Sequence, residues 1–115
     1  MKEFNIKNLR TDTYLGKVAI AEDTASRMKG LLGTQELPFF HGIILKPCKQ
    51  VHTMGMRYPI SVWYINRQLQ VIKIVDKLQP WRIAPFIRIS HLIIEFPQRW
   101  AEITGSQEGD DLLFI

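Results

Sequence analysis

Short segments in which apolar residues alternate with polar ones, or stand together in brief runs, recur along the chain between turn-forming residues. Patterns of period two and short apolar runs are typical of β-strands. They predict eight strands, over residues 4–9, 14–21, 41–46, 50–54, 60–65, 69–75, 91–96 and 112–115. The segments 60–65 and 69–75 are predicted to form a hairpin, because only the short polar loop Asn66-Arg67-Gln68 separates them.

Two helices are predicted to interrupt the strands. Between Asp23 and Gly33 the apolar residues fall on one helical face, and Gly33 can adopt the positive φ angle that often ends a helix. Gly30 lies inside this helix and costs it up to ~1 kcal/mol relative to alanine, which indicates a close backbone contact. A second helix of one or two turns is predicted after Pro97 and ends at Gly105.

Strands dominate these elements, so the sequence favours a mainly β fold. We expect a small barrel-like or two-layer β domain with one or two short helices, and an α+β fold is the alternative. The chain has 115 residues and contains no internal repeat or linker-like stretch. Residues 1–115 are therefore expected to form a single domain.

The composition, with 46% hydrophobic and 23% charged residues, is that of an ordinary globular protein. The longest apolar stretches are far shorter than the ~20 residues that a membrane-spanning helix needs. Residues 1–7 are mostly polar or charged, where a secretory signal would be apolar. Cys48 is the sole cysteine and cannot form an internal disulfide. We therefore expect a cytoplasmic protein without a membrane span.

The net charge of +4 is unevenly distributed. Residues 46–99 contain nine Lys and Arg residues against the two acidic residues Asp76 and Glu95, which gives this region a balance of +7. Such asymmetry can attract an anionic partner over a long range. Exposed Lys and Arg side chains also keep strand-rich surfaces soluble and protect sheet edges, and on charge alone this simpler explanation is favoured.

The segment from Cys48 to Arg57 contains the residues with the greatest chemical capability. If the segment is extended, its side chains alternate between two faces. One face would carry Cys48, Gln50, His52, Met54 and Met56, and the other would carry Lys49, Val51, Thr53 and Arg57. Gly55 permits a bulge or a tight backbone approach, which would break this alternation near its end.

Three interpretations of this segment compete. Its sulfur and imidazole groups suit Cu(I), or zinc with help from His91 or His41, but the spacing matches no closed zinc pattern. A nucleophilic Cys48 would need a tight turn or His91, because Cys48 and His52 lie ~13 Å apart along an extended strand. In the structural interpretation the methionines fill gaps in the core and His52 bonds to the backbone. Residue types alone favour this last interpretation, and we expect no metal and no cofactor.

Several stretches, in order along the chain, carry a family resemblance. They include Cys48 with His52-Thr53-Met54-Gly55-Met56 and Leu78-Gln79-Pro80-Trp81-Arg82, and the matching ranges are 18–21, 25–32, 48–60, 78–82, 94–95 and 105–110. Together they resemble the family called domain of unknown function 192, or uncharacterised protein family 0127. The resemblance implies a compact, mainly β domain and no defined activity. The branch with a Cys-x-x-x-His-Thr-x-Gly-Met stretch looks like a small accessory protein encoded near bacterial secretion or pilus assembly components.

Two positions depart from the pattern of that family. Ser61 stands where the family has aspartate after the Pro-Ile pair, so a charge-based role at that position is lost or is performed by another residue. The family usually has glycine after its Leu-Glu step, whereas Glu95 is followed here by Phe96 and Pro97.

Three functions remain open from the sequence. The first is a noncatalytic binding or accessory domain, expected to be a monomer, whose partner is a protein, a peptide or a small anionic ligand. Its predicted binding residues are Cys48, His52, Thr53, Met56, Arg57, Arg82 and Glu95. Arg57 and Arg82 are suited to hold a carboxylate or phosphate with paired hydrogen bonds.

The second function is a small enzyme that depends on Cys48 and a histidine, with its catalytic residues unassigned. The third is nucleic-acid binding, which is suggested by Lys and Arg residues that alternate with aromatic residues such as Tyr58, Trp81 and Phe86. No recognised RNA-binding signature is present, and aromatic residues at alternating strand positions usually belong to a core, so we expect no nucleic-acid partner.

Overall fold

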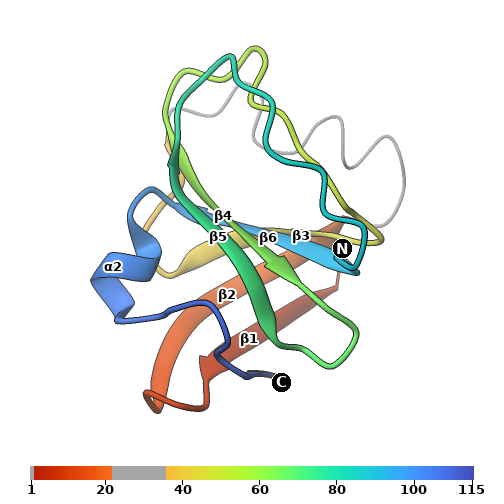
Figure 1. The fold of residues 1–115 in the computed structure, drawn as a ribbon. Helices are drawn as coiled ribbons and strands as arrows, with labels where there is room; N and C mark the ends of the chain where they lie inside the picture. The colour runs from red at the N-terminus through yellow and green to blue at the C-terminus, as the bar shows by residue number, and fades with distance from the viewer. Residues whose placement is uncertain (1, 22–35) are drawn as a thin grey trace.

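The computed structural model describes residues 2–21 and 36–115. These parts form β1 Glu3–Asn8, β2 Thr13–Ala21, β3 His41–Leu45, β4 Ile60–Ile65, β5 Val71–Leu78, β6 Leu92–Pro97, α2 Trp100–Thr104 and β7 Leu112–Phe114 (Figure 1). The predominance of strands confirms the predicted mainly β fold class. The helix predicted between Asp23 and Gly33 lies outside the described residues.

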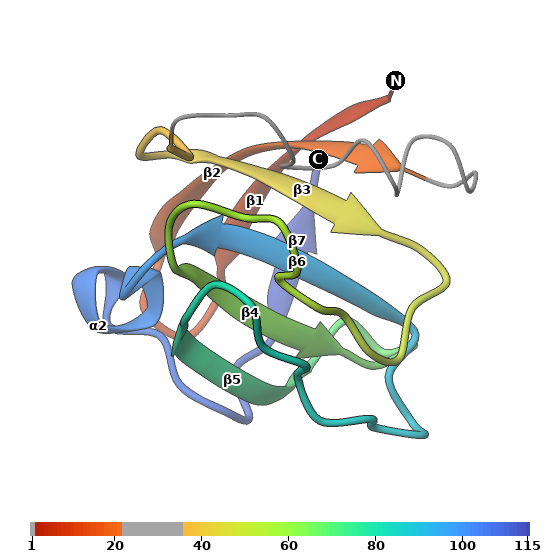
Figure 2. The same ribbon diagram turned by 90° about the horizontal axis from the view of Figure 1, so that it is seen from above.

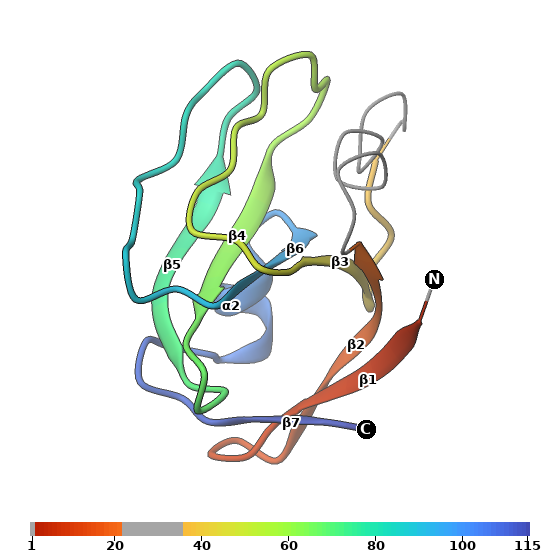
Figure 3. The same ribbon diagram turned by 90° about the vertical axis from the view of Figure 1, so that its right-hand side faces the viewer.

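The strands form one curled sheet in the order β5-β4-β6-β3-β2-β1-β7. Neighbouring strands are antiparallel, except that β2 and β3 pair in parallel with Ala19 opposite Ile43. The curl brings the two ends of the sheet together. The amide of Val71 in β5 donates a hydrogen bond at 2.8 Å to the carbonyl of Asp110, which precedes β7. The result is a half-barrel, with β4 and β5 on one side and β1 and β2 on the other (Figure 3).

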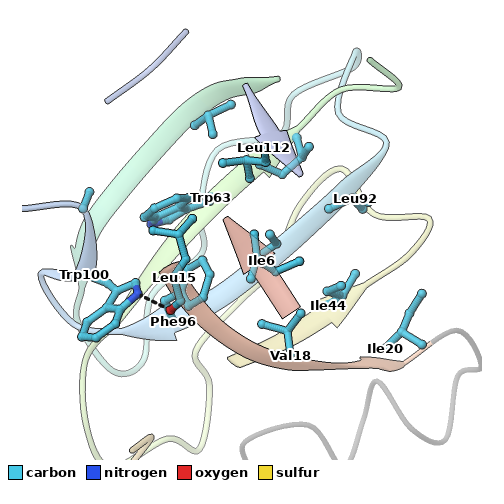
Figure 4. Packing of buried hydrophobic residues seen from close by; sticks show 14 residues of the cluster. Ile6, Leu15, Val18, Ile20, Ile44, Trp63, Leu92, Phe96, Trp100 and Leu112 are labelled. Atoms are coloured by element: carbon cyan, nitrogen blue, oxygen red, sulfur yellow. Dashed lines mark hydrogen bonds between the residues drawn. The ribbon is translucent and has the colours of Figure 1, made fainter. Parts of the chain in front are cut away.

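The inside of the curl encloses a hydrophobic cluster that we call the barrel core. All seven strands and α2 contribute to it, through Ile6, Leu15, Val18, Ile20, Ile44, Trp63, Ile65, Val71, Leu92, Ile94, Phe96, Trp100, Ala101 and Leu112. The rings of Trp63 and Phe96 meet edge to face, with centroids 4.7 Å apart. Trp100 Nε1 donates to the carbonyl of Leu15 at 2.9 Å (Figure 4). Each large side chain buried here stabilises the fold by about 1.5–3 kcal/mol relative to an exposed one.

A second cluster, the outer core, covers the opposite face of β4 and β6. Its members are Ala21, Leu45, Val51, Met56, Ile60, Val62, Tyr64, Leu78, Ala84 and Ile93. Every residue of β4 and β6 is buried, because alternate side chains enter the barrel core and the outer core. Val51, Met56 and Ala84 come from the loops that lie over this face (Figure 2).

The short helix α2 is the second predicted helix. It ends at Gly105, whose φ of 71° is the positive angle expected there. The carboxylate of Asp76 in β5 accepts hydrogen bonds from the amides of Ala101 at 2.9 Å and Glu102 at 3.0 Å. Asp76 therefore fixes the start of α2 against the edge strand. No helix in the described residues is long and apolar enough to cross a membrane.

The predicted strands agree with the observed ones except in two places. The 60–65 and 69–75 hairpin is confirmed, but β5 starts at Val71 because Leu69 adopts a φ of 62°, which an extended strand does not allow. The strand predicted over 50–54 is wrong. In the part of the chain that the structure describes, this segment forms one isolated β-bridge, between His52 and Ile83.

Candidate functional site

Two long loops, residues 46–59 and 79–91, run antiparallel to each other over the outer core, and we call them the loop pair (Figure 1). Five backbone hydrogen bonds connect them, and three of these join residues 49–53 to residues 82–87. The amide of Thr53 donates to the carbonyl of Arg82 at 2.8 Å, that of Ala84 to Val51 at 3.0 Å, and that of Ile87 to Lys49 at 2.9 Å. The loop pair is thus a hydrogen-bonded layer on the sheet.

Thr53 is the residue that binds the two loops together most closely. Its side chain is fully buried, and its hydroxyl donates to the carbonyl of Gln79 at 2.6 Å. The same hydroxyl accepts from the amide of Arg82 at 3.0 Å, while the carbonyl of Thr53 accepts from the amide of Trp81 at 3.0 Å. Thr53 therefore holds the segment 79–82 in one conformation by its side chain and its backbone.

The predicted alternation of side chains holds from residue 50 to residue 54 and then fails. Val51 and Thr53 are buried, whereas His52 and Met54 are exposed. The amide of Met56 donates back to the carbonyl of Thr53 at 3.1 Å, and Gly55 has a φ of 82°, so the backbone turns. This turn places Met56 in the outer core, and its predicted position on the face of His52 is wrong.

A hollow of ≈ 280 Å³ opens on the exposed face of the loop pair. It is lined by Gln50, Val51, His52, Met54 and Ile83. The imidazole of His52 is oriented by its Nδ1, which accepts a hydrogen bond from the amide of Met54 at 3.2 Å. Apolar side chains of the second loop are exposed as well, with Trp81 at 62%, Ile83 at 65% and Phe86 at 62% exposure. Exposed apolar residues gathered on one surface indicate an interaction site.

The charge of the loop pair has one sign. Its Lys and Arg residues are Lys46, Lys49, Arg57, Arg82 and Arg88, and it contains no Asp or Glu. None of the five forms a salt bridge with an acidic residue of the described chain. Its positive potential is therefore available to an anionic partner.

Cys48 lies at the base of the loop pair and is half-buried. Its Sγ donates to the carbonyl of Gln50 at 3.2 Å, a hydrogen bond that requires the protonated thiol. The hydroxyl of nearby Tyr64 donates to the carbonyl of Pro85 at 2.6 Å, and burial, with the proximity of Cys48 second, raises the pKa of Tyr64 to about 12. This environment suits a structural cysteine. No three His, Cys, Asp or Glu side chains of residues 2–21 and 36–115 gather as metal ligands would.

Glu95 lies in the middle of β6, between Ile43 of β3 and Val62 of β4. It faces the side of the outer core and is 5% exposed. No residue of the described chain donates a hydrogen bond to its carboxyl group. Desolvation by burial raises the pKa of Glu95 to about 7, so this carboxyl group is partly protonated at neutral pH.

The fold and the order of the matching stretches agree with one protein family. The model of domain of unknown function 192 (DUF192), described as "Uncharacterized ACR", matches residues 6–114. The chain belongs to the DUF192 family. Membership in DUF192 confirms the resemblance found in the sequence and assigns no activity. No curated protein matches the chain.

Two solved structures share this DUF192 fold. A protein of unknown function from Novosphingobium aromaticivorans DSM 12444 superposes with a TM-score of 0.84 at 17% identity, over 96% of this chain and 83% of that one. A proposed transcription regulator from Sinorhizobium meliloti 1021 superposes with a TM-score of 0.83 at 16% identity, over 97% of this chain and 92% of that one. At these identities the likeness establishes the fold.

The serine that replaces the DUF192 aspartate has an acidic neighbour in space. Ser61 Oγ donates to Asp76 Oδ1 at 2.6 Å and accepts from Trp63 Nε1 at 2.7 Å. A carboxylate from β5 therefore lies beside the position where the family pattern has one on β4. The same Asp76 holds the start of α2, so in this DUF192 chain the acidic group at this place has a structural function.

The seven predicted binding residues divide into two groups. His52, Arg57 and Arg82 are exposed and Cys48 is half-buried, all on the loop pair, whereas Thr53, Met56 and Glu95 are buried. Of the seven, only His52 lines the hollow. Sequence reasoning named Trp81 and Phe86 as binding residues only for the disfavoured nucleic-acid interpretation and did not name Ile83, although all three are exposed. One signal could have found them, because they lie in a stretch interrupted by Pro80 and Pro85, where a buried strand is not expected.

Proposed function

We propose that this DUF192 domain is a noncatalytic binding module that recognises an acidic segment of a partner protein through its loop pair. The observation that carries the proposal is one loop, residues 79–91, in which Trp81, Ile83 and Phe86 are each more than half exposed, within a loop pair that contains five Lys and Arg residues and no Asp or Glu. A ligand that matches this surface has apolar side chains between carboxylates.

The apolar part of the surface supports binding by burial. An isoleucine or aromatic side chain that becomes fully buried contributes about 1.5–3 kcal/mol. The hollow beside His52 and Ile83 has the size to receive one aliphatic or aromatic side chain of the partner. Binding energy is usually concentrated in such central pockets, so Ile83 is the proposed anchor contact.

The basic part of the surface supports orientation and specificity. Arg57 and Arg82 are exposed at the end of the loop pair where the hollow lies, and guanidinium groups bind carboxylates through two parallel hydrogen bonds. Opposite charge raises the rate of encounter and rejects basic competitors. These two arginines are thus proposed to select an acidic ligand.

Rigidity of the loops supports binding without catalysis. The hydrogen bonds of Thr53 fix residues 79–82 before a partner arrives, which lowers the entropy lost on association. The Sγ of Cys48 contacts the carbonyl of Gln50, a partner that does not stabilise a thiolate, and Tyr64 keeps its proton. The binding function thus fits the geometry better than an enzyme does.

The family branch and the class of partner extend this proposal. We assign the chain to the branch with Cys48, His52, Thr53, Gly55 and Met56 at the spacing given above. The resemblance makes a component of bacterial secretion or pilus assembly the proposed partner. The Sinorhizobium neighbour is described as a proposed transcription regulator, so single-stranded DNA is the competing ligand to test.

Amide shifts of the isotope-labelled protein, titrated with synthetic peptides, test the proposal. The probe is a ten-residue peptide in which Asp and Glu alternate with Leu and Phe. Saturable shifts are expected at residues 50–57 and 79–86, and Ile83→Ser should weaken binding by on the order of tenfold. The matched control is Ile103→Ser, which removes another isoleucine that is more than half exposed, from α2, and should leave binding unchanged.

Three further ligands decide between the alternatives. The same peptide with Lys in place of the acidic residues, and one with Ser in place of the apolar residues, should give no saturable shifts. Oligo(dT) at low ionic strength is the third ligand, and its binding falls steeply with added salt. Stronger binding of oligo(dT) than of the acidic peptide, or peptide shifts confined to residues away from the loop pair, would refute the proposed function.

A further inference from the structure

A second concavity lies at the opposite end of the loop pair from the hollow of His52. Its volume is ≈ 480 Å³, and we call it the basic pocket, defined by Lys49, Asn66, Arg67, Arg88, Ser90 and His91. Three separate chain segments meet there: the start of the first loop, the turn between β4 and β5, and the end of the second loop before β6. No motif in the sequence predicts that these segments join in one site.

Hydrogen bonds hold the walls of the basic pocket in place. The amide of His91 donates to the carbonyl of Ile65 at 2.8 Å, and the amide of Cys48 donates to the carbonyl of His91 at 3.0 Å. Lys49 Nζ donates to the carbonyls of Arg88 at 2.5 Å and Ser90 at 3.0 Å. Residues 90 and 91 are therefore fixed between the other two segments, and the ammonium group of Lys49 is held against the pocket wall with one of its three N–H groups left for a ligand.

The turn that carries Arg67 is fixed in the same way. Asn66 Oδ1 accepts hydrogen bonds from the amides of Gln68 at 3.0 Å and Gln70 at 2.9 Å. The side chain of Asn66 thus closes the turn, and Arg67 extends from a defined backbone. A fixed turn reduces the backbone part of the conformational entropy that is lost when a ligand binds.

The electrostatics of the basic pocket are unbalanced. No Asp or Glu lines it, and none of its cations forms a salt bridge within the described residues. Burial, followed by the positive charges of Arg67, Lys46 and Lys49, holds the pKa of His91 below its ordinary value. Among the groups that define the pocket, three permanent cations therefore line a space without a counter-charge, beside an imidazole whose neutral form is favoured.

We propose that the basic pocket binds a tetrahedral dianion, the phosphate group of a small phosphate monoester. Arg67 and Arg88 supply guanidinium groups that match two oxygens each, and Lys49 supplies a point charge. The dianion is favoured over a single carboxylate because three permanent cations converge without an acidic residue. The pocket is larger than a phosphate ion, so the organic part of the ligand also fits inside.

Sulfate is the first probe, because it keeps two negative charges over the pH range in which histidine titrates. We expect saturable amide shifts at Arg67, Ser90 and His91, and a rise in the pKa of His91 because a bound dianion favours the protonated imidazole. Acetate at the same ionic strength should produce neither change. Ribose 5-phosphate should bind more tightly than sulfate if the remaining volume receives the sugar.

The double variant Arg67→Gln and Arg88→Gln should weaken sulfate binding by at least about tenfold. The matched control is Lys17→Gln with Lys77→Gln, which removes the same charge from exposed positions on β2 and β5 and should leave sulfate binding unchanged. Equal weakening in both variants, or shifts with acetate as large as those with sulfate, would overturn the site. The peptide titration concerns the other end of the loop pair, so either proposal can fail alone.

Discussion

The barrel core and the outer core lie on opposite faces of the same strands and differ in chemistry. The barrel core consists of aliphatic and aromatic side chains, and both of its indoles donate a hydrogen bond, Trp100 Nε1 to the carbonyl of Leu15 (Figure 4) and Trp63 Nε1 to Ser61 Oγ. On the outer side, Glu95 is desolvated, Cys48 packs against the cluster, and the loop pair forms the cover. One face of the sheet therefore stabilises the fold, while the other supports a surface.

This difference explains why a carboxyl group is buried on the outer side of the sheet and why apolar side chains are exposed there. The outer side contains a buried carboxyl group at Glu95, and its cover exposes Trp81, Ile83 and Phe86 to water. A protein tolerates such costs most readily away from the core that determines its stability. The contrast predicts that equal substitutions on the two sides have unequal effects.

Phe96→Ala should give the largest effect. Phe96 is fully buried in the barrel core against Trp63, and truncation of such a residue costs about 3–5 kcal/mol. Phe86→Ala on the loop pair is the matched control, expected within about 0.5 kcal/mol of wild type because this ring is exposed. Urea denaturation measures both. Similar losses for the two phenylalanines would eliminate the contrast between the core and the loop pair.

Glu95→Gln should change how stability depends on pH. The pKa of Glu95 is about 7 in the folded protein and near 4.5 when the chain is unfolded. Between pH ~4.5 and pH ~7 the carboxyl group of Glu95 is therefore protonated more often in the folded state than in the unfolded state. Its contribution to the free energy of unfolding is complete below pH ~4.5 and is lost as the pH rises through ~7. The difference amounts to about 3 kcal/mol.

The measurement is urea denaturation of wild type and variant from about pH 4.5 to pH 8. The wild type should lose stability relative to Glu95→Gln as pH rises, and the variant should lack this slope. Glu102→Gln is the control. The hydrogen bond from Arg99 lowers the pKa of this exposed residue, so its carboxyl group does not produce the loss of stability with rising pH that is expected for Glu95. Parallel curves for wild type and Glu95→Gln would show that Glu95 ionises normally and that the outer core is less dry than proposed.

The sequence predicted the strands well where local chemistry decides the structure. The bounds of β4 were correct because apolar and β-branched residues fill it and a polar turn follows. The segment 50–54 shows what a local pattern of hydrophobic and polar residues does not predict. Its alternation correctly indicated which side chains of residues 50–54 share a face, but alternation does not reveal whether a neighbouring strand exists to complete a ladder.

The candidate site was harder to predict because it depends on contacts between distant segments. Nothing local to Thr53 indicates that its hydroxyl joins Gln79 and Arg82. Glu95 was assigned to a binding surface, whereas its position in β6, between β4 and β3 in the sheet, buries it. The pairing of the two loops is a property of the tertiary fold, and the local pattern of a single sequence does not predict it.

Thr53→Val should have the smallest effect on stability of the three. Valine keeps the shape of threonine, but the carbonyl of Gln79 and the amide of Arg82 lose their partner, which costs about 1–3 kcal/mol. Thr13→Val is the matched control, because its half-buried hydroxyl donates to the carbonyl of Thr11 at 3.1 Å in the turn before β2.

The decisive readout is local. Amide hydrogen exchange at Trp81 and Arg82 should accelerate in Thr53→Val, since the loop pair opens more often, while exchange in β4 and β6 should change only by the loss in global stability. Binding of the acidic peptide should weaken as well, although Thr53 is buried and cannot contact the peptide. In the variant the loops would become ordered only on binding, and the free energy of ordering them would reduce the affinity. Unchanged exchange at Arg82 would show that the outer face keeps its surface without this hydroxyl.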